Sequence, residues 1–484
     1  MTAFPLPLRK SLLPALLAGA AASALTGCAS LPKLGAAPVA QPIGHYATAE
    51  SLAAPARTWP ADRWWAAYGD GQLDALIDEA VANAPDLAVA HARARKAEAL
   101  AQQAGAALAP QLGFDASVME TKQSYNNGVP QAFVPHGWND AGQIGLDAGW
   151  QLDFFGRNRA VLAAATSSAE AARVEAAEAR LQISTAVAAA WAELSALYAE
   201  RDATEQALNV RQQTEALIRD RVDHGLENEA AEARTRSQRA AEQSRLAAID
   251  EAIGLTKHRL AALAGQGPDR ALSVGRPSIG AVKAFGLPGD LQADLIGRRP
   301  DIVASRLMAE AAADRIQAAR ADFYPNVNLS AFVGAQSLGL DLLGKSGSST
   351  GQAGLALSLP IFEGGRLRGA YRGARADYDA AVATYNGTLT RALNEVADVA
   401  TSSRALSLRL TPMEDSAAAA RRAWEVTSNR YRGGLATYLE VLTAEDAMIA
   451  AQRAEANLRT RAFALDVALV RALGGGFQSA SRGL

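Results

Sequence analysis

Histidine is the residue type best suited to proton transfer and metal binding near neutral pH, so the histidines are the first place to look for chemistry. There are five of them, far apart along the chain, at His45, His91, His136, His224 and His258. None pairs with another at the spacing of a metal site, and the sequence contains no nucleophile elbow and no phosphate-binding loop. The sequence therefore predicts no catalytic residue, no metal site and no enzyme.

The single thiol belongs to Cys28, so no internal disulfide can form. Arg9 and Lys10 precede a short apolar run, 11–25, which has the character of a secretory signal. The run ends in Leu25-Thr26-Gly27-Cys28, which resembles the bacterial lipobox, in which the cysteine thiol is lipidated and the signal is cut before it. The alternative is an ordinary buried or free thiol.

This motif predicts a lipoprotein signal peptide at 1–27 and a covalent lipid, such as palmitate, on Cys28 as the only non-protein group. Ala29 follows the cysteine, where Asp would favour the inner membrane, and by resemblance to enterobacterial sorting this favours the outer membrane. Residues 28–60 are rich in Pro, Ala and Gly and predict an extended tether from the lipid to the body of the protein.

Composition excludes several classes of protein. The formal net charge of the 484 residues is -2, so no basic excess attracts nucleic acid, and no nucleic-acid partner is expected. After the N-terminus, no apolar run approaches the length of a membrane-spanning helix. If the chain crosses a membrane, it must do so with strands.

Two very long helical hairpins dominate the sequence. The stretch 157–264 contains no proline and only two glycines, and it is rich in good helix formers. It predicts a helix over 157–223, about 100 Å long at 1.5 Å per residue, then a turn and a returning helix. A second hairpin is expected over 365–473, with a kink at Pro412, which removes a helix hydrogen bond.

The chain is a tandem duplication. Pro85 matches Pro300 and Pro110 matches Pro325 at one common spacing, while Gly225 matches Gly434 at a slightly shorter one. The predicted organisation is a first repeat, a Gly- and Pro-rich linker, a second repeat and a short tail, with bounds 61–264, 265–289, 290–474 and 475–484.

Each repeat also predicts a β-hairpin, at about 111–152 and about 326–361. Apolar residues alternate with polar residues or glycine over about 9 to 11 residues per strand, the length that crosses a bilayer when tilted. A soluble sandwich edge or a surface hairpin is the alternative. Aromatic residues near the strand ends are candidates for an interfacial girdle: Trp138, Trp150, Phe155, Phe323, Tyr324 and Phe362.

Four strands cannot close a barrel, and an open sheet edge in lipid leaves backbone groups unpaired at several kcal/mol each. The chain is therefore expected to oligomerise. Two copies would give 8 strands and a filled interior, whereas three would give 12 and leave room for a channel. The expected fold class is an α+β membrane protein with long helical hairpins, four transmembrane strands per chain and a tandem internal repeat.

The chain resembles the TolC-like outer-membrane efflux proteins, in their lipoprotein (NodT/OprM-like) branch. The segments that carry the resemblance are 150–157, Leu295-Ile296-Gly297-Arg298-Arg299-Pro300-Asp301, Phe323-Tyr324-Pro325, 360–366 and 431–442. The resemblance implies a homotrimer in the outer membrane, with a 12-stranded β-barrel and a periplasmic α-barrel of 12 helices. It also implies docking to a periplasmic membrane-fusion adaptor and an RND-type inner-membrane transporter, to export drugs, metals or other small solutes.

By the same resemblance, acidic side chains at the helix turns narrow the periplasmic mouth. Glu440 matches one such position, and Thr443 stands where the family often has a second Asp. The alternative for Glu440 is a solvated carboxylate favoured by the helix dipole. Turn residues matching those that meet the adaptor, which also make the turns themselves, are Gly225, Leu226, Gly433, Gly434, Leu435 and Thr437.

Two rival functions stay open at this point. One is the outer-membrane duct of a type I protein secretion system, which neighbouring genes for an adaptor and a pump would distinguish. The other is a lipid-anchored periplasmic coiled-coil scaffold, which would leave the four amphipathic strands without a purpose.

Overall fold

The computed structural model describes residues 31–280, 282 and 284–479. The predicted signal peptide and Cys28 lie outside the described residues. The chain divides into two compact units, and each repeat contributes to both. The described residues of one unit are 31–39, 95–170 and 306–383, and those of the other are 40–94, 171–305 and 384–479.

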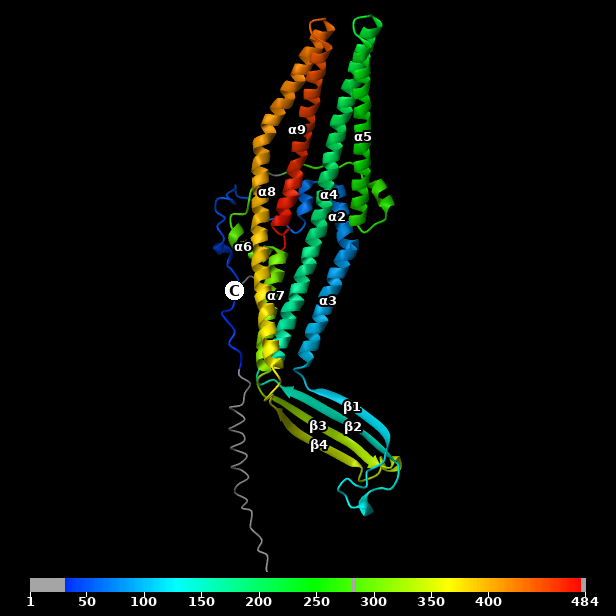
Figure 1. Ribbon diagram of the computed structural model, residues 1–484, viewed down its shortest axis with the longest axis vertical. Helices are drawn as coiled ribbons and strands as arrows, with labels where there is room; N and C mark the ends of the chain where they lie inside the picture. Colours follow the sequence, from blue (N-terminus) through cyan, green and yellow to red (C-terminus); the bar gives the residue numbers. More distant parts are fainter. Residues whose placement is uncertain (1–30, 281, 283, 480–484) are drawn as a thin grey trace, which may run out of the picture. The chain divides into compact units, whose positions relative to one another are not determined.

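Long helices are present in matching pairs (Figure 1). Helices α4 (Arg157–Asp223) and α8 (Arg366–Arg432) have 67 residues each, and α5 (Glu229–Leu263) and α9 (Tyr438–Ala472) have 35 each. Helices α3 (Pro85–Ala106) and α7 (Pro300–Ala321) have 22 each and begin at proline, whose missing N–H is not needed in the first turn. Two shorter helices, α2 (Gly71–Asn83) and α6 (Leu291–Arg298), precede them.

Pro412 lies inside α8, which continues through it. The carbonyl group four residues earlier loses its helix partner there, a common cause of bending. Figure 1 shows α8 bending in its orange part, as a kink near this proline predicts. None of the helices in the described parts of the chain has an 18-residue window apolar enough for a membrane span.

The four strands form one antiparallel sheet in the order β1-β2-β3-β4. Strands β1 (Gln111–Thr121) and β4 (Ser349–Ser358) are the edges, and β2 (Asn139–Leu152) and β3 (Asn326–Leu338) pair in the centre. The contact of β2 with β3 joins the hairpins of the two repeats into one sheet. Strands β1 and β4 have 11 and 10 residues, within the expected length. The central strands β2 and β3, with 14 and 13 residues, are longer than expected.

The strand register puts the predicted apolar positions on a single face. Leu112 pairs with Ala148, which pairs with Ala331 and then Ala353, so one row crosses all four strands. Large apolar side chains on this face stand open, including Phe114 at 65%, Val333 at 63% and Leu355 at 70% exposure. A four-stranded sheet with this face uncovered has no apolar core of its own.

The main apolar core lies in the unit formed by 40–94, 171–305 and 384–479. Val187, Trp191 and Leu194 of α4 follow one another at helical spacing and are at most 1% exposed. Trp64, Trp65 and Tyr68 join the same cluster. Phe323 does not belong with the predicted girdle: it is 2% exposed and contacts Tyr371 edge-on, because it sits at the end of α7 against α8 rather than on the open face.

The segment predicted as an extended tether is held along α8. Arg375 donates to the carbonyl oxygen of Ala36 at 2.6 Å, and Arg404 donates to that of Ser51 at 2.6 Å. Near its end, Trp59 donates to Asp290 at 3.0 Å. These bonds fix the backbone of a segment whose composition alone predicts only extension.

Candidate functional site

The two helical hairpins end in turns of the same construction. In the first, Leu226 donates its backbone N–H to the carbonyl of Arg221 at 2.8 Å, and Gly225 adopts φ +73°. In the second, Leu435 donates to Arg430 at 2.8 Å, and Gly434 also has φ +73°. Glycine adopts this left-handed conformation without a side-chain clash, so these two glycines end the helices.

The other predicted turn residues divide into two kinds. Leu226 is 64% exposed and Leu435 is 72% exposed. The nearby Leu439 is 60% exposed, so three leucine side chains face water at the hairpin ends. Gly433 has no left-handed φ, and a Cβ there would meet its nearest neighbour at 3.6 Å, so the turn does not require glycine at this position. Thr437 is the N-cap of α9.

Glu440 is part of a capping box with Thr437. The Thr437 backbone N–H donates to Glu440 Oε2 at 2.6 Å, the Thr437 hydroxyl donates to the same oxygen at 3.0 Å, and the Glu440 N–H donates back to Thr437 Oγ1 at 3.4 Å. The backbone N–H and the hydroxyl of Thr437 lower the pKa of Glu440. Glu440 is therefore an ionised, exposed carboxylate at the start of a helix.

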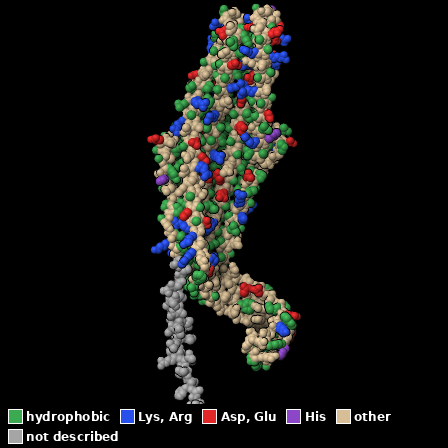
Figure 2. All heavy atoms as spheres, viewed as in Figure 1, with side chains coloured by type: hydrophobic (Ala, Val, Ile, Leu, Met, Phe, Trp, Pro, Cys, Tyr) green, Lys and Arg blue, Asp and Glu red, His purple; other side chains and the backbone are tan. Residues whose placement is uncertain are grey.

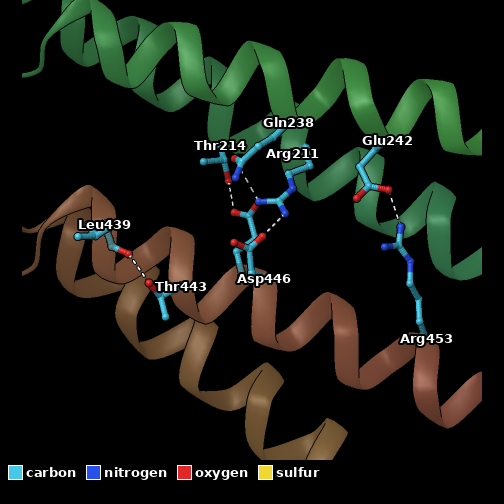
Figure 3. A network of polar contacts seen from close by, with 9 residues as sticks. Arg211, Thr214, Gln238, Glu242, Leu439, Thr443, Asp446 and Arg453 are labelled. Carbon is cyan, nitrogen blue, oxygen red and sulfur yellow. Dashed lines mark hydrogen bonds and ion pairs between the residues drawn. The ribbon is translucent and has the colours of Figure 1, made fainter.

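Thr443 lies one turn further along α9 and is also exposed. Its hydroxyl donates to the carbonyl oxygen of Leu439 at 2.9 Å (Figure 3). Within one chain, no hydrogen bond joins the side chains of Glu440 and Thr443. Any constriction formed by these two positions would need further copies of the chain.

Tyr431 joins the two turns. Its hydroxyl donates to Glu227 Oε1 at 2.9 Å, and its carbonyl oxygen accepts from Arg221 Nη1 at 3.2 Å. The Arg221 guanidinium also lies 4.5 Å from the centre of the Tyr431 ring. Burial and the Glu227 carboxylate raise the pKa of Tyr431, so its hydroxyl is a donor at physiological pH.

A buried ionic network joins the hairpins further from the turns (Figure 3). Arg211 of α4 donates to Glu445 Oε1 of α9 at 2.6 Å and also binds Asp446. Thr214 donates to the other Glu445 oxygen at 2.6 Å, and Gln238 of α5 accepts from Arg211 at 3.3 Å. Arg211 is 6% exposed and Glu445 is 0% exposed.

Electrostatics keep Arg211 charged. Burial alone would lower the pKa of Arg211, but its bonds to the Asp446 and Glu445 carboxylates raise it overall. Four contacts converge on one arginine and one glutamate, and Arg211 Nε is the donor left buried without a partner. A second ion pair, between Arg453 of α9 and Glu242 of α5 at 2.5 Å, lies close to it in Figure 3.

The network was not predicted from the sequence. Arg211 and Glu445 are 234 positions apart in the sequence, and neither differs in type from the many other charged residues of the long helices. The one available signal is Glu445, which lies at helical spacing from Val441 and Met448 on an otherwise apolar face of α9. Across the described ranges, no group of three or more His, Cys, Asp or Glu side chains could hold a metal ion.

Comparison with known proteins identifies the family. The model of the outer membrane efflux protein family matches residues 76–266 and 291–475, one segment for each repeat. The chain is 30% identical over 430 residues to the multidrug resistance outer membrane protein MdtP of Escherichia coli K12, covering 87% of this chain and 88% of MdtP. It is 36% identical over 326 residues to the fusaric acid resistance protein FusA of Burkholderia cepacia, covering 66% of this chain and 60% of FusA.

Solved structures show the same fold. The outer membrane protein VceC of Vibrio cholerae superposes with a TM-score of 0.83 at 46% identity, covering 87% of this chain and all of VceC. The outer-membrane channel OprN superposes with a TM-score of 0.83 at 26% identity, covering 93% and 99%. With the duplicated long hairpins and the four-stranded sheet, these matches establish that the chain belongs to the outer membrane efflux protein family and is an outer-membrane efflux channel of the TolC-like fold.

Proposed function

We propose that three copies of this chain form the exit duct of a tripartite pump, which passively conducts small solutes from a periplasmic adaptor and an RND-type inner-membrane transporter to the outside. One observation carries this proposal. Within the described chain, the edge strands β1 and β4 have no partner on their outer sides, and the apolar face of the same sheet is exposed. In lipid, each unpaired backbone group costs several kcal/mol. Three sheets joined edge to edge give 12 strands and a lumen, whereas two give a filled interior.

The relatives support efflux rather than type I protein secretion, since MdtP and FusA are named for resistance to drugs and to fusaric acid. We infer drug-like small molecules as the exported class. The open apolar face supports a channel over a periplasmic scaffold anchored only by lipid, because a scaffold has no use for such a face.

The assembly is tested by purifying the processed protein in detergent and measuring its mass and its conductance in planar bilayers. We expect a heat-modifiable trimer, extracted only by detergent, that forms steady channels. A stable water-soluble monomer, or a detergent-extracted protein without conductance, would overturn the proposal. In cells, deletion of the gene should increase susceptibility to several unrelated drugs.

Lipidation of Cys28, which lies outside the described residues, completes the proposed anchoring. Replacing Cys28 by alanine should abolish incorporation of labelled palmitate and leave the signal peptide uncleaved by lipoprotein processing. Incorporation that persists in the variant would exclude this site.

We further propose that Glu440 and Thr443 of three copies lie around the periplasmic opening, where three carboxylates would favour cations. Because glutamine also completes a capping box, Glu440→Gln removes the charge and keeps the helix cap. We expect Glu440→Gln to lose most of the cation preference of single channels, and Glu440→Ala to lose it as well. Unchanged conductance and cation preference in both variants would show that Glu440 serves only as a cap.

A further inference from the structure

The two β-hairpins match each other at fixed spacings along the chain. Pro325, just before β3, lies 215 residues after Pro110, just before β1. Gly365 lies 209 residues after Gly156, and each precedes a long helix with a left-handed φ, of +90° and +77°. Strand β1 therefore matches β3 at a spacing of 215 residues, and β2 matches β4 at a spacing of 209.

The strand pairing confirms these spacings residue by residue. Phe114 of β1 pairs with Leu146 of β2. Adding 215 to the first number and 209 to the second gives Leu329 and Leu355, which pair in the second hairpin. The two hairpins therefore have one and the same register.

The contact of β2 with β3, here called the seam, joins the two repeats within the chain. In it, Leu146 pairs with Val333. If three sheets join edge to edge, β4 of one copy meets β1 of the next in the same order of repeats. Transferring the seam by the two spacings places Leu355 of β4 opposite Val118 of β1 in the next copy.

Hydrogen bonds show which backbone groups are free on the two edges. Gln336 donates to the carbonyl oxygen of Ser348 at 2.8 Å, and successive residues of an antiparallel strand bond to opposite sides. Even-numbered residues of β4 therefore bond to β3, and odd-numbered ones direct their N–H and C=O groups outward. In the seam, Gly339 donates to Asp140 at 2.6 Å, so by the same alternation the even-numbered residues of β1 direct theirs outward.

The transferred register joins free groups to free groups. Val118 is an even-numbered residue of β1 and Leu355 is an odd-numbered residue of β4, so both offer outward N–H and C=O groups. A shift by one residue would place the outward groups of one edge opposite residues that already bond inward. Backbone bonding thus allows only registers that differ by two residues, and the duplication selects one of them.

The side chains agree with this register. Val118, Leu355 and Leu357 have their side chains on the open apolar face and are 69%, 70% and 71% exposed. The register sets Val118 opposite Leu355 and Ala116 opposite Leu357, at the distance where directly opposed side chains touch. The apolar face then continues from one copy to the next without a step.

Neither edge carries the devices that keep edge strands apart. Strand β4 contains no charged residue and no proline, and β1 contains neither lysine nor proline. Figure 2 shows fewer charged side chains over the sheet than over the long helices. Natural proteins use lysine, proline or bulges to prevent pairing at an edge, so these two strands are suited to pairing.

One feature of the seam cannot be copied between chains. A Cβ at Gly334 would clash with the carbonyl oxygen of Ile144, so β2 and β3 come very close at that point. The residue of β1 that matches Gly334 is Met119. The copied register is therefore restricted to the residues before it, 115–118, and to their partners, 355–358.

We propose that β4 of one copy pairs antiparallel with β1 of the next copy with Leu355 opposite Val118 and Leu357 opposite Ala116, which repeats the seam between chains. This inference rests on the proposed function, which supplies the joining of three sheets. It adds the register and the partner of each edge residue.

The test is a disulfide between copies. Ser117→Cys and Ala356→Cys in one chain place two thiols opposite each other on the polar face, in a pair without backbone hydrogen bonds, where the Cα atoms lie about 4.5 Å apart. This distance suits a disulfide. After brief oxidation of the detergent-extracted protein, we expect non-reducing gels to show bands of two and three linked chains and none larger.

Two shifted variants are the matched controls. Ser117→Cys combined with Gly354→Cys or with Ser358→Cys moves one thiol by two residues, to a diagonal position about 7–8 Å away. We expect at least tenfold less linked product from either. Stronger linking in a shifted variant than in Ser117→Cys, Ala356→Cys would overturn the register.

Further variants check the chemistry. Asp147→Cys, Phe332→Cys is the same pair in the seam, so it should oxidise within one chain and give no larger band. Ser117→Cys alone and Ala356→Cys alone should give no linked chains, which excludes a contribution from Cys28. If the first double variant fails to assemble, Asp115→Cys, Ser358→Cys tests the next pair of the same register.

Conductance of the reduced variants separates the two levels of the proposal. Variants that form trimeric channels but do not link at either predicted pair would overturn the register and leave the proposed function intact. An unaltered protein that forms neither trimers nor channels would overturn the proposed function, and linked products larger than three chains would contradict its closure at three copies.

Discussion

The contacts around Arg211 and those around Tyr431 join the same two hairpins, but they differ in their exposure to water. The Arg211–Glu445 pair is nearly inaccessible to solvent, whereas Glu227, Thr437 and Glu440 at the turns are open or partly open. Arg211 lies 12 residues before the end of α4 at Asp223, about 18 Å from it at the rise of an α-helix.

Because of this difference, the buried contacts around Arg211 form a fixed connection, and the more exposed contacts around Tyr431 form one that can rearrange. A buried charge that loses its partner keeps its desolvation cost, so the hairpins are held together at Arg211. A half-exposed hydrogen bond is exchanged for a bond to water at little cost. Rearrangement of the turns therefore needs only the outer contacts to change, and this would also hold for the proposed docking of an adaptor.

The largest effect is expected from breaking the buried pair. Arg211→Leu leaves Glu445 unpaired at 0% exposure and should lower the free energy of unfolding by about 3–5 kcal/mol. Denaturant unfolding of the detergent-solubilised protein, followed by tryptophan fluorescence, measures this change.

The paired variant Arg211→Leu, Glu445→Leu is the control. Apolar residues of similar volume in place of both charges should recover most of the loss. If the double variant is as unstable as the single one, packing rather than the unpaired charge is the cause.

A smaller effect is expected at the outer contact. Tyr431→Phe removes the bond to Glu227 and should cost about 0.5–1.5 kcal/mol. Because trypsin cuts when the turn opens, cleavage after Arg430 and Arg432 should become faster, while global stability changes little. Tyr378→Phe, further down the same helix, should not alter this cleavage; equal acceleration in both variants would exclude a local role for the Tyr431 hydroxyl.

The smallest effect is expected in the pH dependence of the helix cap at the start of α9. The folded-state pKa of Glu440 lies below its unfolded value, so the capping box stabilises the first turn of α9 above about pH 4.3, and this stabilisation is lost as the pH falls through the folded pKa. Hydrogen exchange, corrected for its intrinsic pH dependence, should show protection falling in this window.

The matched control is Glu440→Gln, because its neutral amide keeps the capping box without an ionisable group at this position. The same loss of protection, with the same midpoint, in Glu440→Gln would contradict the role of the Glu440 carboxylate.

Local sequence rules predicted the parts of the fold that depend on neighbours in the chain. The absence of proline from 157–264 predicts the long helix, which ends at Asp223 as expected because Gly225 takes a left-handed conformation. Alternation in the strands predicts which residues share a face, and the register confirms it for the row from Leu112 to Ala353.

Pairing between distant elements could not be predicted in the same way. The alanine-rich rods can pack in many registers, so nothing in the sequence aligns Arg211 with Glu445. The N-terminal segment is fixed by bonds to its backbone carbonyls, at Ala36 and Ser51, which carry no side-chain signal. The role of Glu440 at an opening stays a prediction, since it depends on an axis shared by several copies.

The equal lengths of the duplicated rods constrain how such a protein can evolve. An added residue in α4 alone would lengthen it by about 1.5 Å and rotate all later side chains by about 100°, misaligning the contacts with its counterpart. Viable length variants must therefore alter both duplicates together, in steps near seven residues that restore each face. Under the proposed function, the length of the channel is thus a shared property of its two halves, and relatives with longer channels are expected to carry paired insertions in α4 and α8.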